Sequence, residues 1–208
     1  MIAASEALKR LREGNSRFVS NQMQRVSNSH RPDLASGQTP FAIILGCSDS
    51  RVPAELVFDQ GLGDLFVIRV AGNIVAPSQV GSVEFAASRF ETKLVVVIGH
   101  TQCGAIEATM EELTGHASSE SQNLRSIVDM VRPSVESVLD DHRDDPLPEL
   151  ISRATRANVR ASANHLRHGS SLLEQLIRKQ GLLVVGAEYS LETGIVEFFD
   201  GVPAATVR

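Results

Sequence analysis

The two cysteines of this chain, Cys47 and Cys103, each lie in a short segment that is rich in metal-binding side chains. Cys47 belongs to Gly-Cys-Ser-Asp-Ser-Arg at residues 46–51, and Cys103 belongs to Gly-His-Thr-Gln-Cys-Gly at residues 99–104. Zinc binds thiolate, imidazole and carboxylate ligands in a tetrahedron. Because His100 and Cys103 are three residues apart, one turn can direct both at one ion. The sequence therefore predicts a zinc site that contains Cys47, His100 and Cys103.

The fourth zinc position has two interpretations, since either Asp49 or a water molecule could fill it. Three protein ligands with an exchangeable fourth position are typical of catalytic zinc, whereas four fixed protein ligands are typical of structural zinc. A His-x-x-Cys pair alone is weak evidence. Together with Cys-x-Asp-x-Arg in the other segment, it becomes specific.

The elements that position these residues are predicted from short apolar runs of strand length, which are rich in Val, Ile and Phe. They lack strict alternation, as strands buried on both faces of a parallel sheet do. The runs cover residues 41–45, 65–70, 94–98 and 182–187. Helical patterns cover residues 80–90, 105–113, 124–139 and a long stretch at 148–180. This alternation predicts an α/β fold whose mostly parallel central sheet is flanked by helices.

Both cysteine segments directly follow predicted strands. Open parallel sheets bind ligands at the carboxyl ends of their strands. We therefore expect the two segments to meet in one crevice.

The ends of the chain add a helix and a strand. Residues 4–20 form an amphipathic helical pattern with Leu8, Leu11 and Phe18 on one face, and residues 21–40 are polar and predict an extended arm. Residues 195–199 follow a Thr-Gly turn and predict an edge strand. The acidic segment 140–148 is the best candidate hinge, but a predicted strand follows it. We therefore expect residues 1–208 to form a single domain, with residues 1–40 as its N-terminal helix and arm.

The composition of the chain limits which binding partners and which cellular compartment are expected. The chain has 208 residues, with 20 Lys and Arg against 25 Asp and Glu, for a net charge of −5. This sign argues against nucleic acid or an anionic membrane as partner. The apolar runs are far shorter than the ~20 residues of a spanning helix. Two cysteines make no disulfide framework, so a reducing, cytoplasmic location is expected.

The two segments resemble the signatures of the beta-class carbonic anhydrases. Cys-Ser-Asp-Ser-Arg-Val-Pro at residues 47–53 is similar to the first signature, and His-Thr-Gln-Cys-Gly at residues 100–104 to the second. The segment at residues 63–73 is also typical of that family. The resemblance extends from about residue 5 to about residue 200 and is weakest near residues 115–150.

The resemblance implies a lyase that hydrates carbon dioxide reversibly to bicarbonate and a proton, by attack of zinc-bound hydroxide. It implies one zinc ion per chain with Cys47, His100 and Cys103 as permanent ligands. Asp49 and Arg51 would form the catalytic dyad, in which Asp49 either pairs with Arg51 or ligates zinc and closes the site. Because two thiolates cancel the charge of the ion, the bound water should be less acidic than in an all-histidine site. Activity should then rise between about pH 7 and about pH 9.

The resemblance also implies a carbon dioxide pocket that lies partly across a subunit interface. Its lining residues would be Gln38, Phe66, Phe85 and Gly104. The expected assembly is a homodimer or a homotetramer that the N-terminal arm helps to join.

One position departs from some members of the family. They close their site through a bicarbonate pocket of Trp, Arg and Tyr, whose positions here are Ile44, Arg69 and Tyr189, and this chain contains no Trp. We therefore expect that pocket to be incomplete and the open site, with water on the zinc, to be favoured.

Other functions remain as alternatives. The same site could hydrolyse a related heteroallene, such as carbonyl sulfide or carbon disulfide. The chain could also be a non-catalytic zinc-binding protein with Asp49 as a fixed ligand, a thiol-redox protein, or an enzyme with a cysteine nucleophile beside His100. A phosphatase loop is excluded because it needs about five residues between Cys and Arg, and only three separate Cys47 from Arg51.

Overall fold

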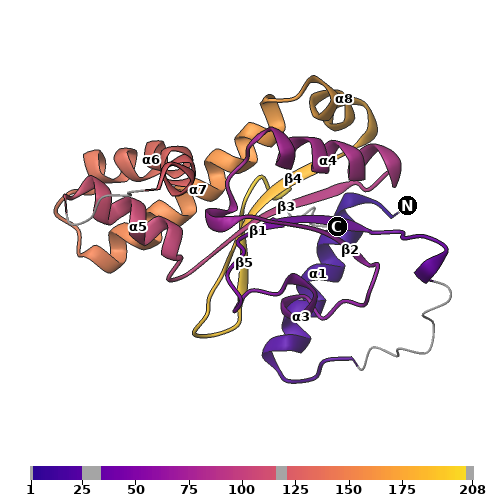
Figure 1. Ribbon diagram of the computed structural model, residues 1–208. Coiled ribbons are helices and arrows are strands. Elements are labelled where there is room, and N and C mark those ends of the chain that lie inside the picture. The colour runs from indigo at the N-terminus through magenta and orange to yellow at the C-terminus, as the bar shows by residue number, and fades with distance from the viewer. Residues whose placement is uncertain (1, 25–33, 116–120, 205–208) are drawn as a thin grey trace.

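A five-stranded sheet forms the centre of the computed structural model, which describes residues 2–24, 34–115 and 121–204 (Figure 1). The strands are β1 (Ala42–Gly46), β2 (Leu65–Arg69), β3 (Leu94–His100), β4 (Leu183–Tyr189) and β5 (Val196–Asp200). Their order is β2-β1-β3-β4-β5, with β1 to β4 parallel and β5 antiparallel to β4. The predicted α/β fold, its mostly parallel sheet and the C-terminal edge strand are confirmed.

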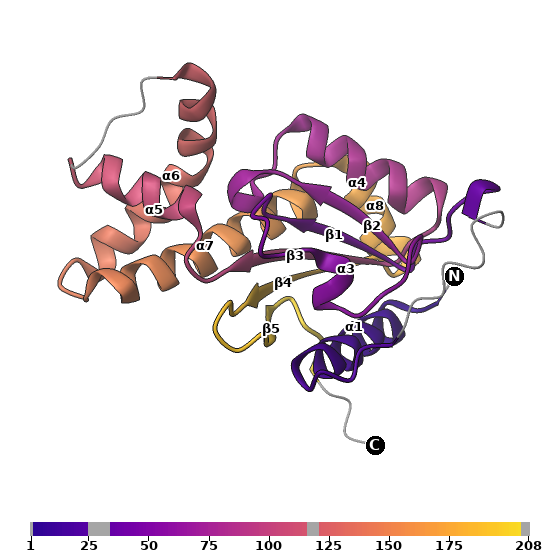
Figure 2. The ribbon, with the colours of Figure 1, turned by 60° about the horizontal axis from the view of Figure 1, so that its bottom comes forward.

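Helices cover both faces of this sheet (Figure 2). They are α1 (Ala4–Val19), α3 (Ala54–Val57), α4 (Pro77–Arg89), α5 (Gly104–Leu113), α6 (Gln122–His142), α7 (Leu147–His168) and α8 (Ser171–Gln180). A short 3-10 turn, η2 (Ala71–Asn73), follows β2. α1 and α3 lie on one face, and α4, α8 and part of α7 lie on the other.

Every residue of β1 and β3 is buried, because alternate side chains enter two different cores. Ile44 and Val96 pack in the core beneath α1, together with Leu11. Ile43 and Val95 pack in the core beneath α4, α7 and α8. Strands that are apolar on both faces explain why these runs show no period-2 alternation.

A third core lies at the carboxyl ends of the strands, where α5, α6 and α7 form a separate helical layer (Figure 1). It includes both cysteines, packed with apolar side chains such as Ile106, Met110 and Val135. The acidic segment predicted as a hinge shrinks to a short turn, since α6 ends at His142 and α7 begins at Leu147.

Two of the predicted helical segments, residues 4–20 and residues 148–180, form helices. α1 confirms the N-terminal amphipathic helix, with Leu8 and Leu11 buried. The long helical stretch predicted at 148–180 is also helical, but it divides into two helices, α7 and α8, at Gly169 and Ser170. A Cβ at Gly169 would lie 2.6 Å from the His165 carbonyl oxygen, and the Ser170 hydroxyl caps α8 by accepting from the Leu173 N–H at 3.1 Å.

Part of the predicted arm, residues 25–33, lies outside the described residues. None of the helices in the described part of the chain is both long and apolar enough to cross a membrane.

Candidate metal centre

Three potential metal ligands meet where β1 and β3 end. The ligand atoms of Cys47, His100 and Cys103 all lie within 4.8 Å of one another. All three side chains are buried, and His100 is completely inaccessible. Cys47 follows β1, His100 is the last residue of β3, and Cys103 is the N-cap of α5. Two strand ends and one helix start therefore bring the three residues together, as expected for segments that follow parallel strands.

The imidazole of His100 provides a test of whether these residues fit a metal ion. Its Nδ1 lies 2.8 Å from the Thr101 carbonyl oxygen, which can only accept, so the hydrogen-bond network assigns the proton to Nδ1. Nε2 is then a buried lone pair with no hydrogen-bond partner among the described residues. A buried nitrogen of this kind is costly unless something binds it. Two sulfurs and this nitrogen are a donor set that suits zinc.

One of the two thiol groups, that of Cys47, is arranged for ionisation. Cys103 donates a hydrogen bond to Cys47, which lowers the pKa of Cys47 and raises the pKa of Cys103. The backbone N–H of Gly72 also donates to Cys47 Sγ, at 3.4 Å. Burial opposes protonation of His100, but the Cys47 thiolate and the Thr101 carbonyl outweigh it and raise the His100 pKa. A cation at this cluster would take the place of the proton that the two thiols share.

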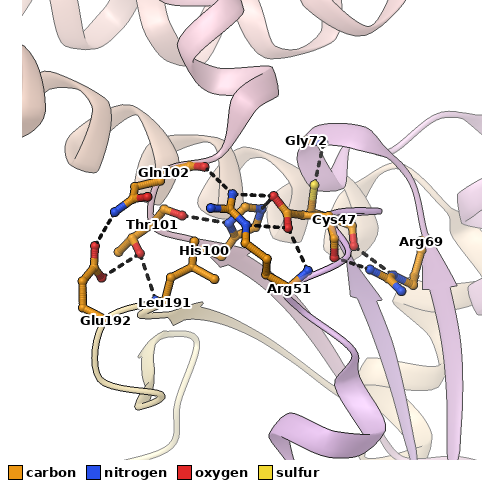
Figure 3. A network of polar contacts seen from close by, with 10 residues as sticks. Cys47, Arg51, Arg69, Gly72, His100, Thr101, Gln102, Leu191 and Glu192 are labelled. Atoms are coloured by element: carbon orange, nitrogen blue, oxygen red, sulfur yellow. Dashed lines mark hydrogen bonds and ion pairs between the residues drawn. The ribbon is translucent and has the colours of Figure 1, made fainter.

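Asp49 and Arg51 form a bidentate ion pair beside the cluster, and Figure 3 shows the Arg51 side chain of this pair. Arg51 Nε donates to Asp49 Oδ1 at 2.9 Å and Nη2 donates to Oδ2 at 2.7 Å. Because Arg51 donates these hydrogen bonds, the pKa of Asp49 lies well below its usual range. Asp49 Oδ2 is 3.9 Å from His100 Nε2. The carboxylate thus lies next to the cluster while the guanidinium holds both of its oxygens.

Arg69 supports the segment that carries Cys47. Its Nε donates to the Cys47 carbonyl at 3.0 Å and its Nη2 donates to the Asp49 carbonyl at 2.5 Å. Ile44 and Tyr189, which the sequence grouped with Arg69, both pack in the core beneath α1.

Sequence reasoning missed two groups of supporting residues. From α7, Asn158 Nδ2 donates to the Gly72 carbonyl at 2.7 Å, and Ser162 donates to the Asn73 carbonyl at 3.0 Å. From the β4–β5 turn, Glu192 accepts hydrogen bonds from the segment between His100 and Cys103. Both groups are far from the cysteine segments along the chain, and no short motif indicates them.

The four predicted substrate-binding residues do not all lie near the cluster. Gly104 is the first residue of α5 and adjoins the cluster. Phe66 contacts Phe85, with ring centroids 6.2 Å apart, but it pairs with Ile43 toward the amino end of the sheet. Gln38 is exposed and precedes β1. Within one chain, only Gly104 lies at the cluster, and the roles of all four residues stay predictions.

Comparison with known proteins identifies the fold and its relatives. The family model for carbonic anhydrase matches residues 42–196. Carbonic anhydrase 2 of Mycobacterium tuberculosis is 39% identical over 190 residues, which cover 90% of this chain and 89% of that protein.

Solved structures agree with this match. The β-carbonic anhydrase CafA of Aspergillus fumigatus superposes with a TM-score of 0.76 at 26% identity, covering 96% of this chain and 92% of that one. A tetrameric β-carbonic anhydrase of Sordaria macrospora gives a TM-score of 0.72 at 26% identity, covering 86% and 89%. The matched residues include both cysteine segments, and the chain belongs to the beta-class carbonic anhydrase family of enzymes.

Proposed function

We propose that this chain is a zinc enzyme that hydrates carbon dioxide reversibly to bicarbonate and a proton. The observation that carries the proposal is the buried, unpartnered Nε2 of His100, which lies among two thiols and next to a carboxylate paired with arginine. The family of the chain supports the same reaction.

Each side chain has a definite part in this proposal. Cys47, His100 and Cys103 would hold one zinc ion per chain. When bound, zinc would act as a Lewis acid that makes a water molecule nucleophilic near neutral pH. Asp49 would accept a hydrogen bond from that water and orient it, because its Oδ2 lies 3.9 Å from His100 Nε2. Arg51 would keep Asp49 from binding the ion itself.

The pairing of Asp49 with Arg51 favours an open site over a structural zinc with four fixed ligands. A guanidinium fork matches both oxygens of a carboxylate and competes with a metal for it. Both oxygens of Asp49 accept from Arg51 here. The fourth position of a bound ion would thereby be left for an exchangeable ligand.

The substrate pocket would be completed by a second copy of the chain. Phe85 is 54% exposed although it is a large apolar residue, and it forms an aromatic cluster with Phe66 and Phe90. Exposed apolar clusters mark interaction surfaces. The related Sordaria structure is described as tetrameric, which supports a homo-oligomer for this chain.

The experiment is stopped-flow carbon dioxide hydration by protein of measured zinc content, at about pH 7.0 and about pH 8.5. We expect turnover at both values and a higher rate at the upper one, because the two thiolates offset the charge of the ion. Turnover only at the upper pH would mean that Asp49 closes the site near neutrality. No turnover at either pH with zinc bound would overturn the proposal, and assays with carbonyl sulfide and carbon disulfide would then test the heteroallene alternative.

A further inference from the structure

The turn between His100 and Cys103 needs external support. Gln102 has a φ of 54°, in the left-handed region that residues other than glycine seldom occupy. Such a conformation persists only when its surroundings hold it. Because this turn carries two of the three cluster residues, whatever holds Gln102 also holds the metal centre.

Glu192, in the turn between β4 and β5, contacts this segment with both carboxylate oxygens (Figure 3). Its Oε1 accepts from Gln102 Nε2 at 2.7 Å, and its Oε2 accepts from the Thr101 hydroxyl at 3.0 Å. The Ser190 hydroxyl also donates to Oε2, at 3.1 Å. The Thr101 hydroxyl in turn accepts from the Leu191 N–H at 3.0 Å. The two turns are thus joined by hydrogen bonds in both directions.

Hydrogen bonds also connect Gln102 to the Asp49–Arg51 pair. The Gln102 carbonyl accepts from Arg51 Nη2 at 3.2 Å, and the same nitrogen donates to Asp49 Oδ2. Thus Glu192 fixes Gln102, the Gln102 carbonyl orients Arg51, and Arg51 holds Asp49. Glu192 itself contacts neither the cluster nor the dyad.

We propose that Glu192 is a positioning residue, which sets the metal centre through the 100–103 turn and the Asp49–Arg51 pair through Gln102. The second half of this proposal rests on the proposed function. Glu192 is exposed, so its hydrogen bonds should add little to the stability of the fold. A positioning role and a merely structural role therefore predict different measurements.

The first test measures the zinc dissociation constant of the holoprotein by competition with a chromogenic chelator. Glu192→Ala should weaken zinc binding about tenfold, the lower end of what outer-sphere changes cause, and should leave the Tm at saturating zinc nearly unchanged. Glu192→Gln keeps one acceptor oxygen and should recover part of the affinity. Glu174→Ala is the matched control, because Glu174 pairs with Arg178 on α8 and lies away from the cluster.

Two results would overturn this half. One is an unchanged zinc affinity in Glu192→Ala. The other is an equal loss in Glu174→Ala, which would indicate a general effect of charge.

The second test is a double-mutant cycle on kcat at saturating zinc, with Glu192→Ala and Arg51→Ala. If Glu192 acts through Arg51, its substitution should lower kcat several-fold in the parent and hardly at all in the Arg51→Ala background. Equal effects in both backgrounds would overturn the link to the dyad. If zinc affinity falls as expected while the parent protein does not hydrate carbon dioxide, the proposed function fails and the role of Glu192 toward the metal stands.

Discussion

The two strand ends that meet at the Cys47–His100–Cys103 cluster are supported in opposite ways. At the end of β1, Cys47 receives a hydrogen bond from Gly72, whose carbonyl is bound by Asn158. Asn158 is 2% exposed and Ser162, which binds the next carbonyl, is 6% exposed. At the end of β3, the support comes from Glu192, an exposed side chain on a turn.

Because the hydrogen bonds are buried at one strand end and exposed at the other, substitutions at the two ends should affect different properties of the protein. A buried hydrogen bond is costly to break, because the abandoned group cannot turn to water. An exposed one is replaced by water, so only the direction of the groups that it held is lost. We expect changes on the β1 side to destabilise the protein, and changes on the β3 side to alter the site alone.

The largest effect should come from the cluster itself, where the two sides should be equivalent. Cys47→Ser and Cys103→Ser should each weaken zinc binding by more than about a hundredfold, beyond the range of outer-sphere changes, because each removes one thiolate. Metal content after dialysis, measured by atomic absorption, checks this. Retention of one zinc per chain by either variant would show that the two ends do not share an ion.

The dyad joins the two sides, since Asp49 follows β1 and Arg51 donates to the Gln102 carbonyl after β3. Asp49→Asn and Arg51→Ala should keep zinc and lose about a hundredfold or more in carbon dioxide hydration, as for other proton-handling groups. Stopped-flow rates with zinc content measured in parallel test this. Full turnover in either variant would refute the role of the pair.

On the buried side, Asn158→Leu should leave the Gly72 carbonyl without a partner and cost about 1–3 kcal/mol of stability. For a chain of this size that corresponds to a fall in Tm of roughly 2–12 °C. Scanning calorimetry measures it. Asn164→Leu is the matched control on the same helix, because Asn164 is exposed and should tolerate the change. An equal fall in both variants would remove the contrast between the two sides.

The smallest expected effect is the pH dependence of the stability that Glu192 contributes at the end of β3. The backbone N–H of Glu192 and the hydroxyls of Thr101 and Ser190 hold the pKa of Glu192 below its usual range. A lowered pKa means that the folded state binds fewer protons, so this stabilisation is present above the unfolded pKa of about 4.3 and is lost as pH falls below it. The Tm difference between the parent and Glu192→Gln should be on the order of 1 °C at pH 7. A difference that persists unchanged at about pH 3.5 would contradict this assignment.

The sequence predicts the residues of the cluster better than the residues that support it. The strands are visible as apolar runs, and the two cysteine segments follow them, so the meeting of Cys47, His100 and Cys103 follows from general rules for parallel sheets. Asn158, Ser162 and Glu192 could not be found in that way. Asn158 and Ser162 face the site only because of how α7 packs, and Glu192 because of where the β4–β5 turn lies.

The helical break at Gly169 and the positions of Phe66 and Phe85 show the same limit. The stretch at 148–180 has continuous helical periodicity, and the break is explained by the close approach of His165 to Gly169 and by the Ser170 cap of α8. Phe66 and Phe85 lie away from the cluster within one chain, so their predicted role depends on an interface that one chain does not contain.

If the cluster binds zinc as proposed, the alternation of side chains between two cores along β1 would make metal uptake a measure of correct folding. One residue inserted into β1 would exchange Ile43 and Ile44 between the two cores and turn Cys47 away from His100. Such a protein could keep its helix and strand content and still bind no zinc. Zinc stoichiometry would therefore detect errors of strand register that circular dichroism cannot see.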